Sequence, residues 1–161
     1  MDELLPVAQQ IAAILVDRHQ TVGVAESSSG GLICAALLSV PGASAYFVGG
    51  GVVYTRTSRS ALLEIPDSAI SGIRASTEAY ALLLARSVRS KLGTDWSVAE
   101  SGASGPTGNR YGDAPGHSCV AVCGPSEASQ TLETDDARRL ENMYRFAAAA
   151  LRLLLETAGR A

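Results

Sequence analysis

Segments with two different periodicities alternate along the chain, and this alternation strongly limits the folds that it can adopt. Leu4, Val7 and Ile11 recur at helical spacing, which predicts an amphipathic helix over residues 3–19. A short apolar segment, TVGVAE (21–26), follows and is typical of a buried strand. Helix and strand continue to alternate, so we expect an α/β fold in which helices cover a mostly parallel sheet.

The end of the chain predicts a change of strand direction. Residues 117–124 and 129–134 are two strand-like segments joined through Gly124 and Pro125, which favours an antiparallel pair. We therefore expect a three-layer α/β/α sandwich with a mixed, mostly parallel sheet of about five strands, one of them antiparallel. Two further strands are expected over 51–55 and 96–101, and four further helices over 32–40, 58–65, 77–92 and 136–157. A turn is expected at 27–31 and a loop at 102–116. Ser76 is expected to be the N-cap of the helix over 77–92.

Composition narrows the class of protein. With 161 residues and a formal charge of −3, the chain fits one domain, 1–161, and lacks the basic stripe expected of a nucleic-acid or anionic-membrane partner. No basic leader precedes an apolar stretch, and no apolar run approaches the roughly 20 residues of a membrane span. We expect a cytoplasmic protein with no nucleic-acid or membrane partner.

The cysteines favour a reducing compartment. Cys34, Cys119 and Cys123 are odd in number and lie in apolar segments, which is typical of buried, reduced thiols. The Cys-x-x-x-Cys spacing without a second pair of ligands is weak evidence for zinc, which takes four ligands. We expect neither a metal nor a cofactor.

Small polar residues follow three of the expected strands. The segments are AESSSGG, YTRTSR and ESGASGPTG, and ligands of such sheets collect outside the carboxyl ends of the strands. Gly30 and Gly31 open a helix, whose N-terminus attracts a phosphate or an oxyanion. Neither a P-loop nor a Rossmann fingerprint is present. The composition therefore predicts a ligand-binding site that is not one of the standard nucleotide-binding motifs.

Taken together, these segments resemble the CinA C-terminal domain family, the nicotinamide-nucleotide amidohydrolases. Members carry A-E-S-C-T-G-G, P-G-S-S-A-x-F, Y-S-N-E-A-K and T-G-I-A-G-P, and then a final helix preceded by an arginine. The resemblance covers nearly the whole chain and implies a stand-alone form without the N-terminal domain of the long members. The corresponding segments here are AESSSGG (25–31), PGASAYF (41–47), YTRTSR (54–59), SGASGP (101–106) and DDARRLENMYRFAAAAL (135–151).

The resemblance implies an activity and a set of site residues. The expected reaction converts nicotinamide mononucleotide into nicotinate mononucleotide and ammonia, so the expected partner is a small-molecule nucleotide; a homo-oligomer is left open. Ser44 corresponds to the nucleophile, and Tyr54 and Arg59 to the tyrosine and lysine that assist it. The substrate-binding residues expected to border the same concave site are Ser27, Gly30, Gly31, Ser101 and Gly102.

Arg59 departs from the family pattern, because an arginine stays protonated and cannot act as a base. We expect it to be a fixed cation that holds a phosphate or an oxyanion. The base is left open between Tyr54, His117, Glu26 and Glu100. Restoring lysine at position 59 would raise activity if only the base is missing, which the intact neighbouring motifs favour, and would lower it if the site is built around a guanidinium.

The last helix leaves further alternatives open. Arg138, Arg139 and Asn142 lie near the family's arginine and either bind the substrate phosphate or only cap and solvate the helix. The chain is accordingly expected to be an active amidohydrolase. The alternatives are a catalytically impaired pyridine-nucleotide binding protein, because the lysine is absent, and a different hydrolysis or acyl transfer on the same scaffold.

Overall fold

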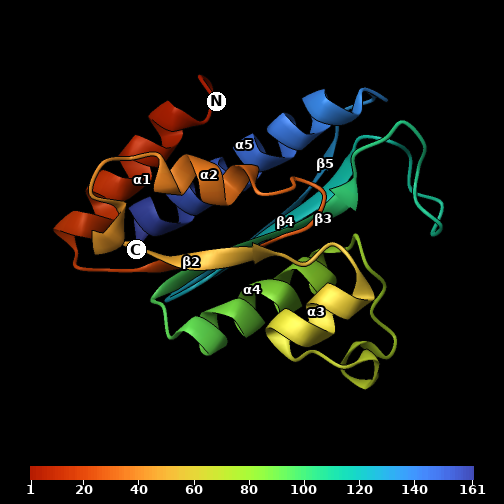
Figure 1. The fold of residues 1–161 in the computed structure, drawn as a ribbon, viewed down its shortest axis with the longest axis horizontal. Coiled ribbons are helices and arrows are strands. Elements are labelled where there is room, and N and C mark those ends of the chain that lie inside the picture. Colours follow the sequence, from red (N-terminus) through yellow and green to blue (C-terminus); the bar gives the residue numbers. More distant parts are fainter.

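The computed structural model describes residues 1–161 and has one five-stranded sheet in the order β2-β1-β3-β4-β5 (Figure 1). β1 is parallel to β2 and to β3, and β4 is antiparallel to both of its neighbours. The expected mixed sheet with one reversed strand is therefore confirmed. The strands are β1 (Val22–Glu26), β2 (Phe47–Val52), β3 (Trp96–Ala103), β4 (His117–Cys123) and β5 (Glu127–Glu133).

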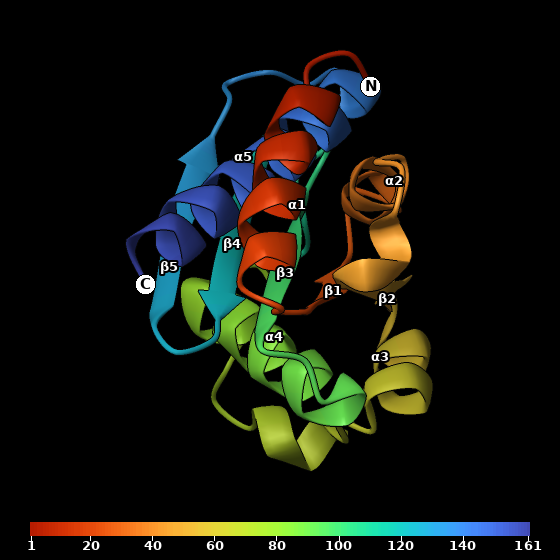
Figure 2. The same cartoon turned by 90° about the vertical axis from the view of Figure 1, so that its left-hand side faces the viewer.

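Helices cover both faces of this sheet, which confirms the three-layer sandwich. α1, α2 and α5 lie on one face, and α3 and α4 lie on the other (Figures 1 and 2). None of these helices combines the length and the apolar character that crossing a bilayer requires. Their bounds are α1 (Leu5–Asp17), α2 (Leu32–Leu38), α3 (Arg56–Leu63), α4 (Glu78–Leu92) and α5 (Arg139–Arg160), with short 3-10 turns at η1 (Ala43–Ala45) and η2 (Asp67–Ile70).

The alternation of side chains along the central strands gives the sheet two separate cores. Val24 and Val98 pack with α1, α2 and α5, whereas Ala25 and Ala99 pack with α4. Successive side chains of a strand point to opposite faces, so the same alternation continues into the polar strand ends. It directs Glu26 toward α2 and leaves the following residue, Ser27, on the α4 face.

β2 differs from the expected strand at 51–55. It begins at Phe47 and includes the glycine triplet at 49–51, most of which the expected strand left out. A Cβ at Gly50 would lie 2.7 Å from both the Cys34 Sγ and the Val24 Cβ, so glycine lets α2 and β1 pack closely against this edge strand. The triplet therefore belongs to the strand, and its small size serves packing.

The observed ends of several other helices and strands differ from the expected ones. α3 begins at Arg56 rather than at residue 58, because the Thr55 hydroxyl accepts the Ser58 N–H at 3.1 Å and caps the helix. The fourth long helix is capped by Thr77 rather than by Ser76. The last helix begins at Arg139 rather than at residue 136, and β3 extends to Ala103, which shortens the following loop.

Candidate functional site

A cavity of about 940 Å³ opens on the α3/α4 side of the sheet, at the carboxyl ends of β1, β2 and β3. Its wall is polar as well as apolar, and it receives side chains from five separate segments of the chain. This is the edge of the sheet at which ligands of such folds collect. Among its lining residues are Ser27, Tyr54, Arg59, Ser76, Ser101 and Gly102.

Ser27 follows the last residue of β1 and lies on the wall of this cavity. Its backbone N–H donates to Glu100 Oε2 at 3.1 Å, whereas its hydroxyl has no hydrogen-bond partner in the protein and is half-buried. The Val53 N–H donates to the Glu26 carbonyl at 2.7 Å, so the ends of β1 and β2 stay paired and Tyr54 follows directly beside Ser27. Ser27 and Tyr54 therefore both line this cavity.

Ser101 offers a second hydroxyl on the floor of the cavity. The Ser76 N–H donates to Ser101 Oγ at 3.3 Å, and this leaves the Ser101 hydroxyl proton available to a ligand. The next residue, Gly102, has to be glycine, because a Cβ there would lie 2.5 Å from the His117 carbonyl oxygen. Both residues therefore lie where the sequence predicted them, in the same cavity as Ser27 and Tyr54.

Glu26 and Glu100 lie on the opposite face of the sheet and do not line the cavity. Glu26 accepts the backbone N–H groups of Ile33 and Cys34 at the start of α2. Glu100 is fully buried, and burial raises its pKa although hydrogen bonds from Ser28, Ser29 and other donors act in the opposite direction. The two carboxylates fix the turn that follows β1, so neither is placed to take a proton inside the cavity.

Arg59 reaches into the cavity wall as a paired cation. Only 3% of it is exposed, its Nε donates to the Ile65 carbonyl at 3.2 Å, and its Nη2 forms an ion pair with Asp67. Burial acts to lower the pKa of Arg59, but hydrogen bonds to Tyr80 and Asp67 outweigh it and raise the pKa above its usual range. A guanidinium held in this way is a fixed charge and not a base.

Arg138, Arg139 and Asn142, the three residues expected to bind substrate from the last helix, lie in three different surroundings. Arg139 donates from Nη1 to the Gly105 carbonyl at 2.7 Å and from Nη2 to Tyr54 Oη at 3.4 Å. Arg138 instead lies outside the helix and pairs with Asp136 at 2.6 Å. Of the two arginines, only Arg139 therefore touches a side chain of the cavity.

Asn142 is placed differently from the expectation that it binds substrate. It is completely buried, and its amide donates to the carbonyl groups of Ser104 and Asp136 and accepts from Thr134 Oγ1. Both of its amide N–H groups are used in joining the loop after β3 to the start of α5. Asn142 does not line the cavity, and its contacts favour the structural alternative over a contact with substrate.

Gly30 and Gly31 precede α2 as expected, but they face away from the cavity. Both have positive φ angles, 68° and 100°, which glycine adopts without strain. A Cβ at Gly30 would lie 2.6 Å from Met143 Cε on α5. These glycines therefore allow a tight turn and the approach of α5, and the prediction that they border the site with Ser27 is wrong.

Ser44 lies at the other end of the sheet. It belongs to η1, which immediately precedes β2, and the parallel register pairs Phe47 with Val22 at the start of β1. The five residues of β1 separate this end from Ser27, which is roughly 17 Å at about 3.3 Å per residue. Within one chain, the prediction that Ser44 shares a concave site with Ser27, Tyr54 and Ser101 is therefore wrong.

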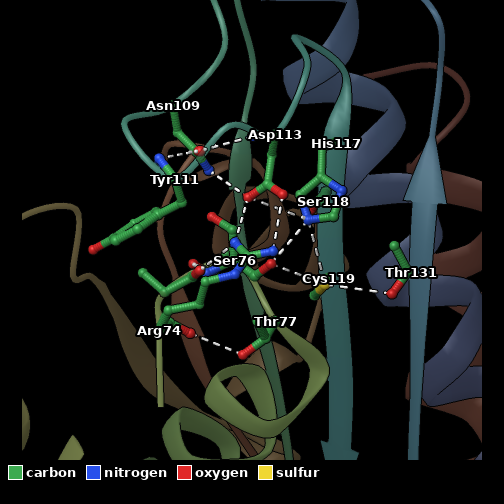
Figure 3. A network of polar contacts seen from close by, with 12 residues as sticks. Arg74, Ser76, Thr77, Asn109, Tyr111, Asp113, His117, Ser118, Cys119 and Thr131 are labelled. Carbon is green, nitrogen blue, oxygen red and sulfur yellow. Dashed lines mark hydrogen bonds and ion pairs between the residues drawn. The ribbon is translucent and has the colours of Figure 1, made fainter. Parts of the chain in front are cut away.

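A polar network outside the expected motifs supports the far wall of the cavity (Figure 3). His117 is buried and places Nε2 2.8 Å from the Ser76 carbonyl oxygen and Nδ1 2.5 Å from Glu133 Oε1. Because both neighbours are acceptors, the imidazole donates from both nitrogens and is positively charged. Ser76 itself has a φ of 58°, a strained conformation that this contact helps to hold.

No group of three or more His, Cys, Asp or Glu side chains is placed to hold a metal ion. The polar and charged residues that the sequence did not assign to the cavity include Arg56, Arg74, Asn109, Arg110 and Tyr111. The only signal for the last three was the length of the glycine-rich loop, since loops of this length are usually functional or disordered.

The fold and the cavity define an α/β domain with a polar ligand pocket at the carboxyl ends of a mostly parallel sheet. The family model described as CinA C-terminal domain matches residues 4–158, and the chain belongs to this family. A CinA-like protein of Parasynechococcus marenigrum is 38% identical over 133 residues, which are 83% of this chain and 32% of that protein. The chain thus spans about a third of the length of the curated relatives it matches.

Solved structures show the same fold at lower sequence identity. A CinA superfamily protein of Klebsiella pneumoniae has a TM-score of 0.90 and 21% identity, with 98% of this chain and 99% of that chain covered. The competence/damage inducible protein CihA of Agrobacterium tumefaciens has a TM-score of 0.88 and 24% identity, with 96% and 94% covered. These likenesses establish the fold.

Proposed function

We propose that this domain hydrolyses the carboxamide of nicotinamide mononucleotide to nicotinate mononucleotide and ammonia, with Ser27 as the nucleophile. The observation that carries the proposal is the unpartnered Ser27 hydroxyl on the wall of the cavity, between Tyr54 and Ser101. A serine attacks a carbonyl group when a neighbouring base takes its proton. Ser27 belongs to the A-E-S segment that resembles the family pattern.

Tyr54 is the group best placed to take that proton. The cavity wall has no lysine, histidine or glutamate, and its one aspartate, Asp67, is engaged with Arg59. The Arg139 guanidinium donates to the Tyr54 oxygen at 3.4 Å, and this contact holds the phenol oxygen at the cavity. Tyr54 therefore replaces the lysine of the family pattern as base, and Arg59 supplies charge to the wall.

The reaction then follows as two acyl-transfer steps. Ser27 Oγ bonds to the carboxamide carbon while its proton passes to Tyr54, and the carbonyl oxygen becomes an oxyanion that the Ser101 hydroxyl can donate to. The C–N bond breaks as the nitrogen takes the proton from Tyr54 and leaves as ammonia. A water molecule then attacks the Ser27 ester, restoring the serine and releasing the nicotinate nucleotide.

A second candidate is a pyridine-nucleotide binding domain without turnover. The observation that favours it is the state of Arg59, which occupies the position of the family's lysine but is locked against Asp67 and Ile65. Such a pocket retains cations and hydroxyl groups for binding and lacks an amine that could deprotonate.

Steady-state ammonia release by the purified domain separates the two candidates. The first predicts ammonia and nicotinate mononucleotide in equal amounts from nicotinamide mononucleotide. The second predicts saturable binding of the same nucleotide by calorimetry, with no ammonia above a buffer control. Absence of both ammonia and binding contradicts both.

A further inference from the structure

The arginines around the cavity differ in whether a carboxylate neutralises them. Arg59 is paired with Asp67, and Arg74 is paired with Asp113 through two contacts of 2.6 and 2.9 Å. Arg56 and Arg110 line the same cavity and have no carboxylate partner in the chain. Two uncompensated positive charges therefore face this cavity, although the whole chain has a formal charge of −3.

The loop that carries Arg110 is braced by side-chain contacts. Asn109 accepts the Tyr111 N–H at 2.9 Å and donates to Asp113 Oδ2 at 2.8 Å. Asp113 in turn forms the ion pair with Arg74, so the tip of the loop is tied to the segment before α4 (Figure 3). Gly108 is needed for this arrangement, because a Cβ there would lie 2.1 Å from the Asp113 carbonyl oxygen.

Tyr111 fixes the direction of Arg110. The Arg110 Nη2 donates to Tyr111 Oη at 2.9 Å, and the guanidinium carbon lies 5.0 Å from the centre of the Tyr111 ring. A cation over an aromatic face is held in place while its remaining N–H groups stay free. Arg110 is exposed, so these donors are open to a ligand at the rim of the cavity.

Arg56 presents the second free cation from a different element. It is the first residue of α3, exposed, and follows Thr55, whose side chain and backbone form a capping box with Ser58. The cap fixes the start of the helix and therefore the position of Arg56 at the rim. Ser101 is buried in the same cavity, whereas Arg56 is exposed, so the hydroxyl-bearing floor is distinct from the rim that carries Arg56.

We infer that Arg56 and Arg110 bind the phosphate monoester of the substrate at the rim of the cavity, and that they make the site specific for a nucleotide over its nucleoside. This inference rests on the proposed function. Guanidinium groups bind phosphate through paired charge-assisted hydrogen bonds. With the phosphate at the rim, the carboxamide end of the molecule is the part that reaches Ser27 and Ser101.

Two substrates that differ only in the phosphate test this assignment. Ammonia release is measured with nicotinamide mononucleotide and with nicotinamide riboside for the unchanged protein, Arg56→Gln, Arg110→Gln and the double variant. Each single change should lower kcat/KM for the mononucleotide roughly tenfold through KM, because it removes hydrogen bonds to a charged group. The value for the riboside should not change.

Arg152→Gln is the matched control, since Arg152 is also an exposed arginine without a carboxylate partner but lies on α5, across the sheet. It should leave both substrates unaffected. Equal losses on both substrates, or no loss on either, would overturn the phosphate assignment while ammonia release from the unchanged protein still supported the proposed function.

Calorimetry with nicotinamide mononucleotide keeps the assignment testable if no ammonia is released. Binding by the unchanged protein that the double variant loses, and that weakens as salt is added, supports the phosphate site and contradicts the proposed function. Equal binding by both proteins, or no binding at all, contradicts the phosphate site.

Discussion

The guanidinium of Arg59 is held from two directions, by the Ile65 carbonyl at 3.2 Å and by Asp67. These contacts join α3 to the segment that follows it and form part of the cavity wall. The closeness of the surrounding motifs to the family pattern favoured a gain of activity on return to lysine. The structure favours the opposite, because an ammonium group cannot reproduce the planar, two-pronged contact.

Arg59→Lys is therefore expected to lower the free energy of unfolding by about 1–3 kcal/mol, because the buried Ile65 carbonyl loses its charged donor and the ion pair with the exposed Asp67 is weakened. Ammonia release should fall rather than rise. Urea unfolding and steady-state kinetics on the same preparations measure both quantities. A variant with unchanged stability and higher activity would show that the position needs only a base.

At the scale of elements, the ends of β1 and β3 are joined by one carboxylate. Glu100 on β3 accepts the backbone N–H groups of Ser27 and Ser29 and the hydroxyl groups of Ser28, Ser29 and Ser118. The turn that carries Ser27 is therefore shaped by a strand 73 residues further along the chain. This explains how a segment made of serine and glycine holds one conformation.

Glu100→Gln should lower the free energy of unfolding by about 2–4 kcal/mol, because the amide NH2 would face donors in a buried site. Glu127→Gln is the control: Glu127 forms an exposed ion pair with Arg86, which contributes at most about 1 kcal/mol. Equal stabilities for the two variants in urea would contradict the role assigned to Glu100.

β4 and the segment before α4 are joined by a charged histidine. Burial acts to lower the pKa of His117, but its hydrogen bonds to Glu133 and to the Ser76 carbonyl, together with the charges of Asp113 and Glu133, raise it above its ordinary value. A raised pKa in the folded state stabilises the protein fully below the unfolded pKa of about 6.5. That contribution is lost as the pH rises through the higher folded pKa.

The stability difference between the unchanged protein and His117→Gln should therefore be larger at pH 6 than at pH 9, by roughly 1 kcal/mol for each unit of pKa shift. Asp113 stays ionised in this range, because its pKa is lowered by Arg74. Urea unfolding of both proteins at the two pH values gives the difference. A difference that is constant with pH would mean that folding does not shift the pKa of His117, and a difference that is larger at pH 9 would mean that His117 is held uncharged in the folded state.

At the scale of the whole molecule, the order of helices and strands could be predicted from the sequence, because β1, β3 and β4 are short buried strands bounded by turn residues. The start of the strand at Phe47–Val52 could not, because glycine is unfavourable inside a strand unless close packing requires it, and the packing of α2 against Gly50 is known only from the structure. Similarly, Asn142 looked available on a polar helix end, and only the tertiary structure buries it.

The assignment of the nucleophile depends on this same topology. The strands β1, β2 and β3 run in parallel, so residues just after each of them meet at one edge and residues just before each of them meet at the other. Ser27, Tyr54 and Ser101 lie at the carboxyl edge, and Ser44 precedes β2 at the opposite edge. Motif order along the chain carries no information about this separation.

Ammonia release by Ser27→Ala and Ser44→Ala is the most direct test of the central claim. Both replace a serine hydroxyl by hydrogen, and neither hydroxyl has a hydrogen-bond partner in the protein, so both variants should unfold at nearly the same urea concentration as the unchanged protein. Ser27→Ala should lose at least about a thousandfold in kcat, because the covalent route is removed. Ser44→Ala should retain nearly full activity; loss in Ser44→Ala with activity retained in Ser27→Ala would contradict the account.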